Sequence, residues 1–284
     1  MRMPNIAVLP SLVTLGNAVC GFAAIGVMLK APHLDLLLAD NSRALAAINT
    51  AGFLILLAMV FDALDGRVAR FTRATSDFGG QLDSLSDAVS FGAAPALLAY
   101  RLFVDTVENP AFHRLAIVMA AVYACCAILR LARFNVENVH DEEAHMWFRG
   151  LPSPAAAGAI AGLVILVPEL WTLEAYPQLS MVVIWSLPLV LLVVGALMVS
   201  NVRYSHLVNH MIRGRRPLSY VLQVLICIAL VFFLQEKVLA LLFIGYVLSG
   251  PAALVLRRLI PARRGHPVVP PAADADHKQD APKA

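Results

Sequence analysis

The chain has 284 residues, of which 60% are hydrophobic and only 14% are charged. A soluble domain averages about 45–50% apolar and about 25% charged residues, so this composition excludes an ordinary soluble protein and indicates a polytopic membrane protein. The net charge of +3 is small, and the sequence has no basic run with interleaved aromatic residues, so nucleic acid is not an expected partner.

Eight apolar segments follow one another along the chain, and most approach the ~20 residues that cross a bilayer. Backbone groups in the bilayer core must be satisfied within the segment, so each one is expected to be a helix. The segments are roughly 9–29, 45–63, 86–104, 113–133, 154–172, 179–200, 217–234 and 238–256. We therefore predict an all-α fold, a polytopic membrane helical bundle of about eight transmembrane helices over residues 1–258. Residues 259–284 are rich in Pro, Ala and charge and are predicted to form a disordered cytoplasmic tail.

The positive charges predict how the bundle is oriented. With the N-terminus in the cytoplasm, eight spans place most of the 22 Lys and Arg residues on the cytoplasmic side. Those on the opposite side are Lys30, Arg43, Arg101, Arg114 and Lys237. The positive-inside rule favours this orientation, and we expect an integral protein of the inner (cytoplasmic) membrane.

A cluster of acids lies at the cytoplasmic seam between the second and third apolar segments. Its members are Asp62, Asp65, Asp83 and Asp87. Residues three or four apart share a helix face, so each pair forms a stripe, and a short connection at about residues 71–78 would bring the two stripes together. Four carboxylates in a small volume cannot all stay ionised without cations. Two Mg²⁺ or Mn²⁺ ions would resolve this, and such a pair suits phosphoryl displacement.

Small residues and arginines accompany these acids. Gly66, Ala69 and Gly79 leave space for a bulky ligand near the backbone, and Arg70 offers a donor fork for phosphate. One alternative is that the acids make interfacial salt bridges to the neighbouring arginines. Another is a cation-transport pathway, although that would favour acids at mid-bilayer on several helices.

The acids, the small residues and Arg70 form one continuous pattern: Asp62-x2-Asp65-Gly66-x2-Ala69-Arg70-x8-Gly79-x3-Asp83-x3-Asp87. It resembles, at every position, the motif of the CDP-alcohol phosphatidyltransferases. In that family a phosphatidyl group passes from a CDP-lipid to an alcohol, and CMP is released. The resemblance implies that the four aspartates hold two metals, that Asp87 is the general base and that the protein forms a homodimer. It also implies that the CDP moiety is accommodated by Gly66, Ala69, Arg70 and Gly79.

Further segments resemble the phosphatidylserine synthase branch of that family. They are Pro4-Asn5 with Thr14, Asn17 and Cys20-Gly21; Ser86 to Gly92 with Pro95; Arg130 to Asn135; Gly150 to Pro154; and Ser200 to Tyr204. This branch implies CDP-diacylglycerol and L-serine as substrates, with membrane lipids around the protein. Serine needs a cation for its carboxylate, and the candidates for serine binding are Arg130, Arg133, Asn135 and Arg203. The alternative is that these arginines only anchor the topology.

The expected reaction is thus transfer of the phosphatidyl group of CDP-diacylglycerol to L-serine at the cytoplasmic face. An alternative within the family is the same transfer to glycerol 3-phosphate or inositol. An intramembrane Mg-dependent prenyltransferase is a second alternative, although its acidic motifs lie far apart in sequence. A divalent-cation carrier is the non-enzyme alternative, and it would not need the Gly, Ala and Arg positions.

Overall fold

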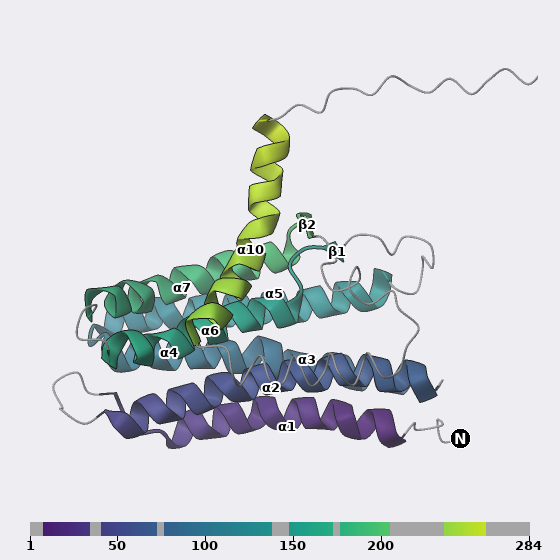
Figure 1. Cartoon of the computed structure of the whole chain (residues 1–284), viewed down its shortest axis with the longest axis horizontal. Helices are drawn as coiled ribbons and strands as arrows, with labels where there is room; N and C mark the ends of the chain where they lie inside the picture. The colour runs from purple at the N-terminus through teal and green to yellow at the C-terminus, as the bar shows by residue number, and fades with distance from the viewer. Residues whose placement is uncertain are drawn as a thin grey trace, which may run out of the picture.

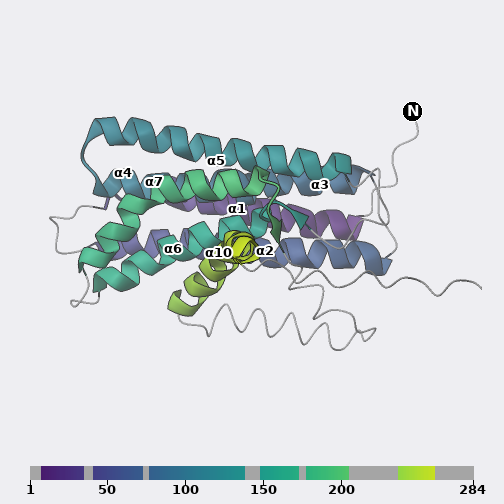
Figure 2. The ribbon, with the colours of Figure 1, turned by 90° about the horizontal axis from the view of Figure 1, so that it is seen from above.

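The chain folds into helices that run lengthwise beside one another, apart from α10, which rises steeply out of the bundle (Figure 1). The computed structural model describes residues 8–34, 41–72, 77–137, 148–172, 177–204 and 236–259. The helices are α1 (Val8–Lys30), α2 (Ser42–Thr72), α3 (Asp77–Asp87), η1 (Ala88–Ala93), α4 (Ala94–Thr106), α5 (Pro110–Glu137), α6 (Ser153–Thr172), α7 (Pro177–Val199) and α10 (Glu236–Leu259). Seen from above, the C-terminal part of α10 points almost along the line of sight while the other helices run across the view (Figure 2).

The helical membrane architecture expected from the sequence is confirmed, but the count of eight spans is not. Within the described residues, five stretches are long and apolar enough to cross a membrane: Pro10–Lys30, Ser42–Val68, Phe78–Thr106, Pro110–Val136 and Gln178–Val199. The predicted spans 154–172 and 238–256 correspond to shorter apolar helices, Ser153–Pro168 and Ala240–Ala252. The predicted span 217–234 and nearly all of the predicted tail lie outside the described residues.

The third span begins earlier than the apolar pattern suggests and contains an irregular turn. Helix α3 leads through η1, a π-helix, into α4, so the span covers Phe78–Thr106 rather than 86–104. The early part is polar on one face, so hydrophobicity alone does not reveal it. In η1, the buried Phe91 offers its carbonyl to the Tyr123 hydroxyl of α5, which donates a 3.0 Å hydrogen bond.

Close approaches at glycine hold the helices together. A Cβ on Gly21 of α1 would lie 2.4 Å from the Ser90 Oγ and 2.7 Å from the Ser90 Cα, so α1 and η1 meet at the backbone. Likewise, a Cβ on Gly158 of α6 would lie 2.4 Å from the Phe243 ring of α10. Small residues that admit a neighbouring helix are typical of packing inside membranes.

A short clasp joins the start of α6 to the end of α7. The strands β1 (Phe148–Arg149) and β2 (Arg203–Tyr204) pair antiparallel, and Gly150 follows with φ of 84°, a conformation that favours glycine. The Gly150 N–H donates to the Val202 carbonyl at 2.8 Å. The buried Tyr204 hydroxyl donates to the Val247 carbonyl of α10 at 3.1 Å. The clasp therefore fixes Leu151, which contacts the site described below.

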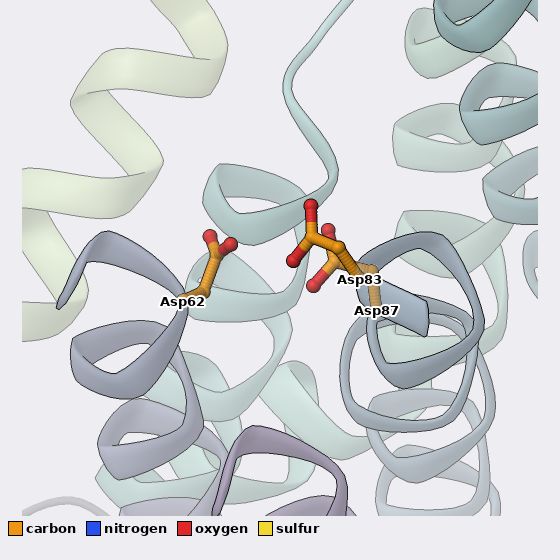
Figure 3. A group of neighbouring side chains, drawn as sticks. All are labelled: Asp62, Asp83 and Asp87. Carbon is orange, nitrogen blue, oxygen red and sulfur yellow. The ribbon is translucent and has the colours of Figure 1, made fainter. Parts of the chain in front are cut away.

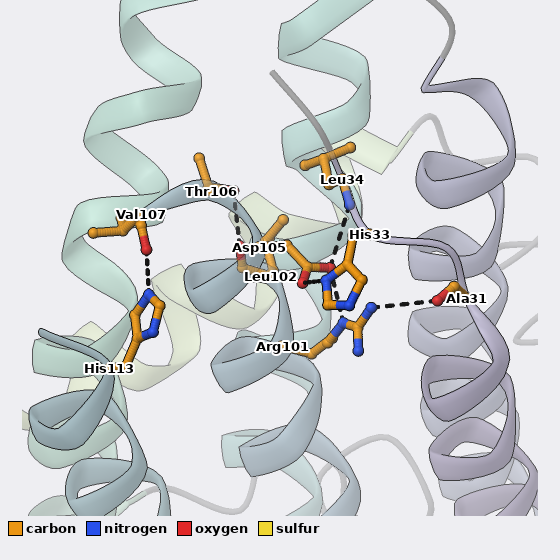
Figure 4. A network of polar contacts seen from close by, with 9 residues as sticks. All are labelled: Ala31, His33, Leu34, Arg101, Leu102, Asp105, Thr106, Val107 and His113. Carbon is orange, nitrogen blue, oxygen red and sulfur yellow. Dashed lines mark hydrogen bonds and ion pairs between the residues drawn. The ribbon is translucent and has the colours of Figure 1, made fainter. Parts of the chain in front are cut away.

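A polar network ties α1 to α4 at the ends away from the acids (Figure 4). Asp105 is largely buried; it accepts from the Arg101 Nε at 2.8 Å and lies 2.9 Å from the His33 Nδ1. The Arg101 Nη2 also donates to the Ala31 carbonyl at 3.3 Å. This arrangement sets where α1 ends against α4.

Candidate active site

Three aspartates from two helices meet in one group. The carboxylate oxygens of Asp62 on α2 and of Asp83 and Asp87 on α3 lie within 4.8 Å of one another. Figure 3 shows Asp62 facing the other two across the space between the helices. Asp87 is buried, and Asp62 and Asp83 are half-buried. The two stripes expected from the sequence thus face one another, and α1 packs against both α2 and α3.

Asp65 lies beside this group and is held by the first helix. Its side chain is buried, and its Oδ2 accepts a hydrogen bond from the Thr14 hydroxyl of α1. Its charge still acts on both Asp62 and Asp83, so it belongs to the same acidic site. The sequence predicts four neighbouring acids. In the structure, the carboxylates of Asp62, Asp83 and Asp87 converge, and Asp65 lies next to them, bonded to Thr14.

Asp87 is also held by α1. The Asn17 Nδ2 donates to the Asp87 Oδ1 at 2.9 Å, and the Asn17 side chain is fully buried. In the sequence, Thr14 and Asn17 stand out only through the resemblance to the phosphatidylserine synthase branch, and neither is predicted to belong to the site. The signal that could have found them is the presence of two polar side chains three residues apart in an apolar span, because such residues inside membranes are costly and functional by default.

The residues expected to accommodate CDP are only partly described. Gly66 is exposed, and a Cβ placed on it would meet nothing within 4 Å, so there is room for a ligand one residue beyond Asp65. Gly79 lies half-buried in α3. Ala69 and Arg70 continue α2, but their side chains lie outside the described part of the structure. The roles of these residues stay predictions.

The residues expected to bind serine have different surroundings. Arg130 on α5 is buried, donates from Nε to the Leu151 carbonyl and lies with Nη1 3.5 Å from the Ser153 Oγ. Its charge acts on Asp87. Arg133 is half-buried, and its Nη2 donates to the Asn201 Oδ1 at 3.2 Å.

The other two predicted serine-binding residues are Asn135, which links two helices, and Arg203, of which only the backbone is described. The Asn135 Nδ2 donates to the Ser84 Oγ of α3 at 2.9 Å, which links α5 to α3. Arg203 lies in β2, and its side chain is outside the described residues. Of the predicted set, Arg130 is the described cation that acts electrostatically on the acidic group.

The donor set fits a divalent cation. Carboxylate oxygens are the hard ligands that Mg²⁺ and Mn²⁺ prefer. Three such groups within 4.8 Å repel one another, and a bound cation would relieve that repulsion. The open space at Gly66 leaves room for a phosphate-bearing ligand beside the acids. The arrangement therefore suits metal-assisted chemistry on a phosphate ester.

Comparisons with known proteins agree with this chemistry. A family model described as CDP-alcohol phosphatidyltransferase matches residues 7–196. The chain is 36% identical over 187 residues to a CDP-diacylglycerol–serine O-phosphatidyltransferase of Methanocaldococcus jannaschii, covering 66% of this chain and 76% of the relative. It is 35% identical over 204 residues to a protein of the same name from Helicobacter pylori, covering 70% and 77%.

A third relative differs in name. An archaetidylserine synthase of Methanothermobacter thermautotrophicus is 34% identical over 205 residues, covering 72% of each chain. The family match spans α1 to α6 and most of α7, and so includes the four aspartates, Thr14, Asn17 and Arg130.

Proposed function

The chain belongs to the CDP-alcohol phosphatidyltransferase family, and from that membership we propose that it transfers the phosphatidyl group of CDP-diacylglycerol to L-serine, releasing CMP. The observation that carries the proposal is the convergence of the Asp62, Asp83 and Asp87 carboxylates within 4.8 Å. The choice of serine is supported by the names of the relatives from Methanocaldococcus jannaschii and Helicobacter pylori.

The four aspartates are proposed to hold two divalent ions, Mg²⁺ or Mn²⁺. Such ions, when bound, would neutralise the diphosphate and stabilise the charge that develops during displacement. Asp62 and Asp65 would supply oxygens from α2, and Asp83 and Asp87 from α3. The support is the hard oxygen donor set and the buried position of Asp65 and Asp87.

Asp87 is proposed to act as the general base. The serine hydroxyl oxygen forms the new bond to phosphorus, the bond from phosphorus to the CMP oxygen breaks, and the hydroxyl proton passes to the Asp87 carboxylate. Asp87 lies one turn beyond Asp83 along the span and is the more buried of the two. A deeper position along the span supports a place beside the lipid-linked phosphate of the substrate.

Binding of the two substrates is divided between the helices. Gly66, Ala69, Arg70 and Gly79 are proposed to accommodate the CDP moiety, supported by the open space at Gly66. Arg130 is proposed to pair with the serine carboxylate, because it is a buried cation whose charge acts on Asp87. Arg133 bonds to Asn201, just after the end of α7, and Asn135 bonds to Ser84 of α3. These contacts favour structural roles for both residues. Arg203 stays a candidate for the carboxylate.

The proposed setting is the inner (cytoplasmic) membrane with the active site facing the cytoplasm. Residues 1–258 would form one membrane domain of eight spans, followed by a cytoplasmic tail at 259–284, and two chains would form a homodimer. The support is the distribution of Lys and Arg, which under the positive-inside rule favours a cytoplasmic position for the acidic site.

The decisive experiment measures CMP release by the purified protein with CDP-diacylglycerol and one alcohol at a time. The panel is serine, glycerol 3-phosphate, inositol and choline, and the Asp62→Asn variant serves as the inactive control. Release that depends on serine, with phosphatidylserine formed in equal amount, is expected. Release with another alcohol instead would reassign the substrate. No CMP release with any alcohol would refute the proposed transfer.

A further inference from the structure

Asn17 is an uncharged polar residue buried in the membrane-spanning part of α1. Its side chain is fully buried, and it lies within the span Pro10–Lys30. A polar group in that setting is costly unless its hydrogen bonds are made. Apolar packing alone therefore does not explain why an amide side chain is buried at this position.

Only the donor half of the Asn17 amide has a partner in the described part of the structure. Its Nδ2 donates to the Asp87 Oδ1 at 2.9 Å, whereas its own Oδ1 is buried with no hydrogen-bond partner among the described residues. The hydrogen bond that the Asn17 amide makes is therefore the one that holds the Asp87 carboxylate. This contact fixes the orientation of the Asp87 carboxylate and leaves its Oδ2 without a hydrogen bond from Asn17.

The main chain of Asn17 is fixed at the same place. The Ser90 hydroxyl of η1 donates to the Asn17 carbonyl at 2.9 Å. Gly21, one turn further along α1, permits this approach, because a Cβ there would lie 2.4 Å from the Ser90 Oγ. Ser90 follows Asp87 by three residues, so α1 contacts the Asp87 region through both its main chain and a side chain.

From this geometry we propose that Asn17 is a positioning residue that orients the Asp87 carboxylate for proton transfer. The inference rests on the proposed function, because it presumes that Asp87 takes the proton of the alcohol. Thr14 makes the corresponding contact with Asp65, which is proposed to hold metal only. The two contacts from one helix are therefore expected to support different tasks, proton transfer for Asn17 and metal retention for Thr14.

The test compares Asn17→Leu, which has the same branched arrangement of heavy atoms and no donor, with Thr14→Val and with Gly26→Ala. Gly26→Ala is the matched neutral control on the same helix, because a Cβ there meets nothing within 4 Å. Each variant is measured for kcat and for KM of both substrates at saturating Mg²⁺. Binding of Mn²⁺ without substrates is followed by electron paramagnetic resonance. The alcohol is whichever one the wild-type protein accepts.

We expect Asn17→Leu to lower kcat by roughly 10- to 100-fold, the usual cost of losing a group that supports a site residue. Both KM values should stay within about 2-fold, and the Mn²⁺ affinity should fall less than in Thr14→Val, because Asp87 shares the metals with three other aspartates. Thr14→Val should instead weaken Mn²⁺ binding, with its rate recovering at high metal. Gly26→Ala should match the wild type.

A wild-type kcat for Asn17→Leu, or full recovery of its rate by added metal, would overturn the proposal. A lower kcat accompanied by similar rises in both KM values and a similar fall in Mn²⁺ affinity would also overturn it. Such a result would indicate that the substitution disturbs the whole site. If Asn17→Leu does not fold, Asn17→Ala decides, because it also removes the Nδ2 donor, and an unchanged kcat there would refute the positioning role. Failure of the proposed function looks different, because the wild type itself would then release no CMP with any alcohol.

Discussion

Replacing Arg130 by Gln tests how the enzyme recognises serine. The substitution keeps a polar side chain but shortens it and removes the charge. Arg130 already uses Nε for the Leu151 carbonyl and directs Nη1 towards Ser153, so the remaining guanidinium N–H groups are those available to a carboxylate. A hydrogen bond to a charged group contributes about 1.5–3 kcal/mol, and about 1.4 kcal/mol corresponds to a factor of ten. We therefore expect the serine KM to rise by roughly 10- to 100-fold.

The assay is CMP release with serine varied at saturating CDP-diacylglycerol, and then the converse. The KM for CDP-diacylglycerol should change by less than about 3-fold, since Arg130 is assigned to the other substrate. Arg133→Gln is the matched control, because Arg133 lies one turn further on α5 and bonds to Asn201. Thermal unfolding measures the separate cost of leaving the Leu151 carbonyl unpaired. Equal serine KM values for Arg130→Gln, Arg133→Gln and the wild type would refute the assignment.

Three further predictions concern the base, the topology and the irregular turn. Asp87→Asn should still bind CDP-diacylglycerol but lose about 10²–10⁴-fold in kcat, measured by single-turnover CMP release; recovery at high Mg²⁺ or Mn²⁺ would show a metal ligand only. Reporters fused after residue 258 and within 201–216 should be cytoplasmic, and one near 106–110 should lie on the opposite face; reversed accessibility would contradict the orientation. Tyr123→Phe removes the donor to the Phe91 carbonyl and should lower the free energy of unfolding by about 1–3 kcal/mol, seen in detergent as a lower Tm than wild type; an unchanged Tm would contradict this.

The spacing of the acids was enough to predict which helix faces meet. Asp62 and Asp65 are three residues apart and Asp83 and Asp87 four apart, so helical geometry alone aligns each pair. Helix α2 ends at Thr72 and α3 starts at Asp77, so the short connection keeps the linked ends of the two helices near each other. Local periodicity and a short link therefore sufficed to predict the contact between Asp62, Asp83 and Asp87.

The contacts made by α1 and α5 could not be predicted in the same way. The pairings of Thr14 with Asp65 and of Asn17 with Asp87 join residues 51 and 70 positions apart, and no periodicity links them. Arg130 and Arg133 look alike in sequence, yet one is buried near Asp87 and the other bonds to Asn201. These differences arise from how whole helices pack against one another, which a single sequence does not reveal.

The π-turn at Ala88–Ala93 makes backbone conformation, and not only residue identity, a determinant of the direction in which the α3 acids face. An α-helix advances by about 100° per residue, since it has 3.6 residues per turn. A π-helix fits one more residue into a turn than an α-helix does, so converting this turn into a regular α-helix of unchanged length would rotate α3 by about that angle relative to α4. Asp83 and Asp87 would then face away from Asp62 even though no acidic side chain had been changed. A variant whose turn is made regular without deleting a residue is therefore expected to be inactive.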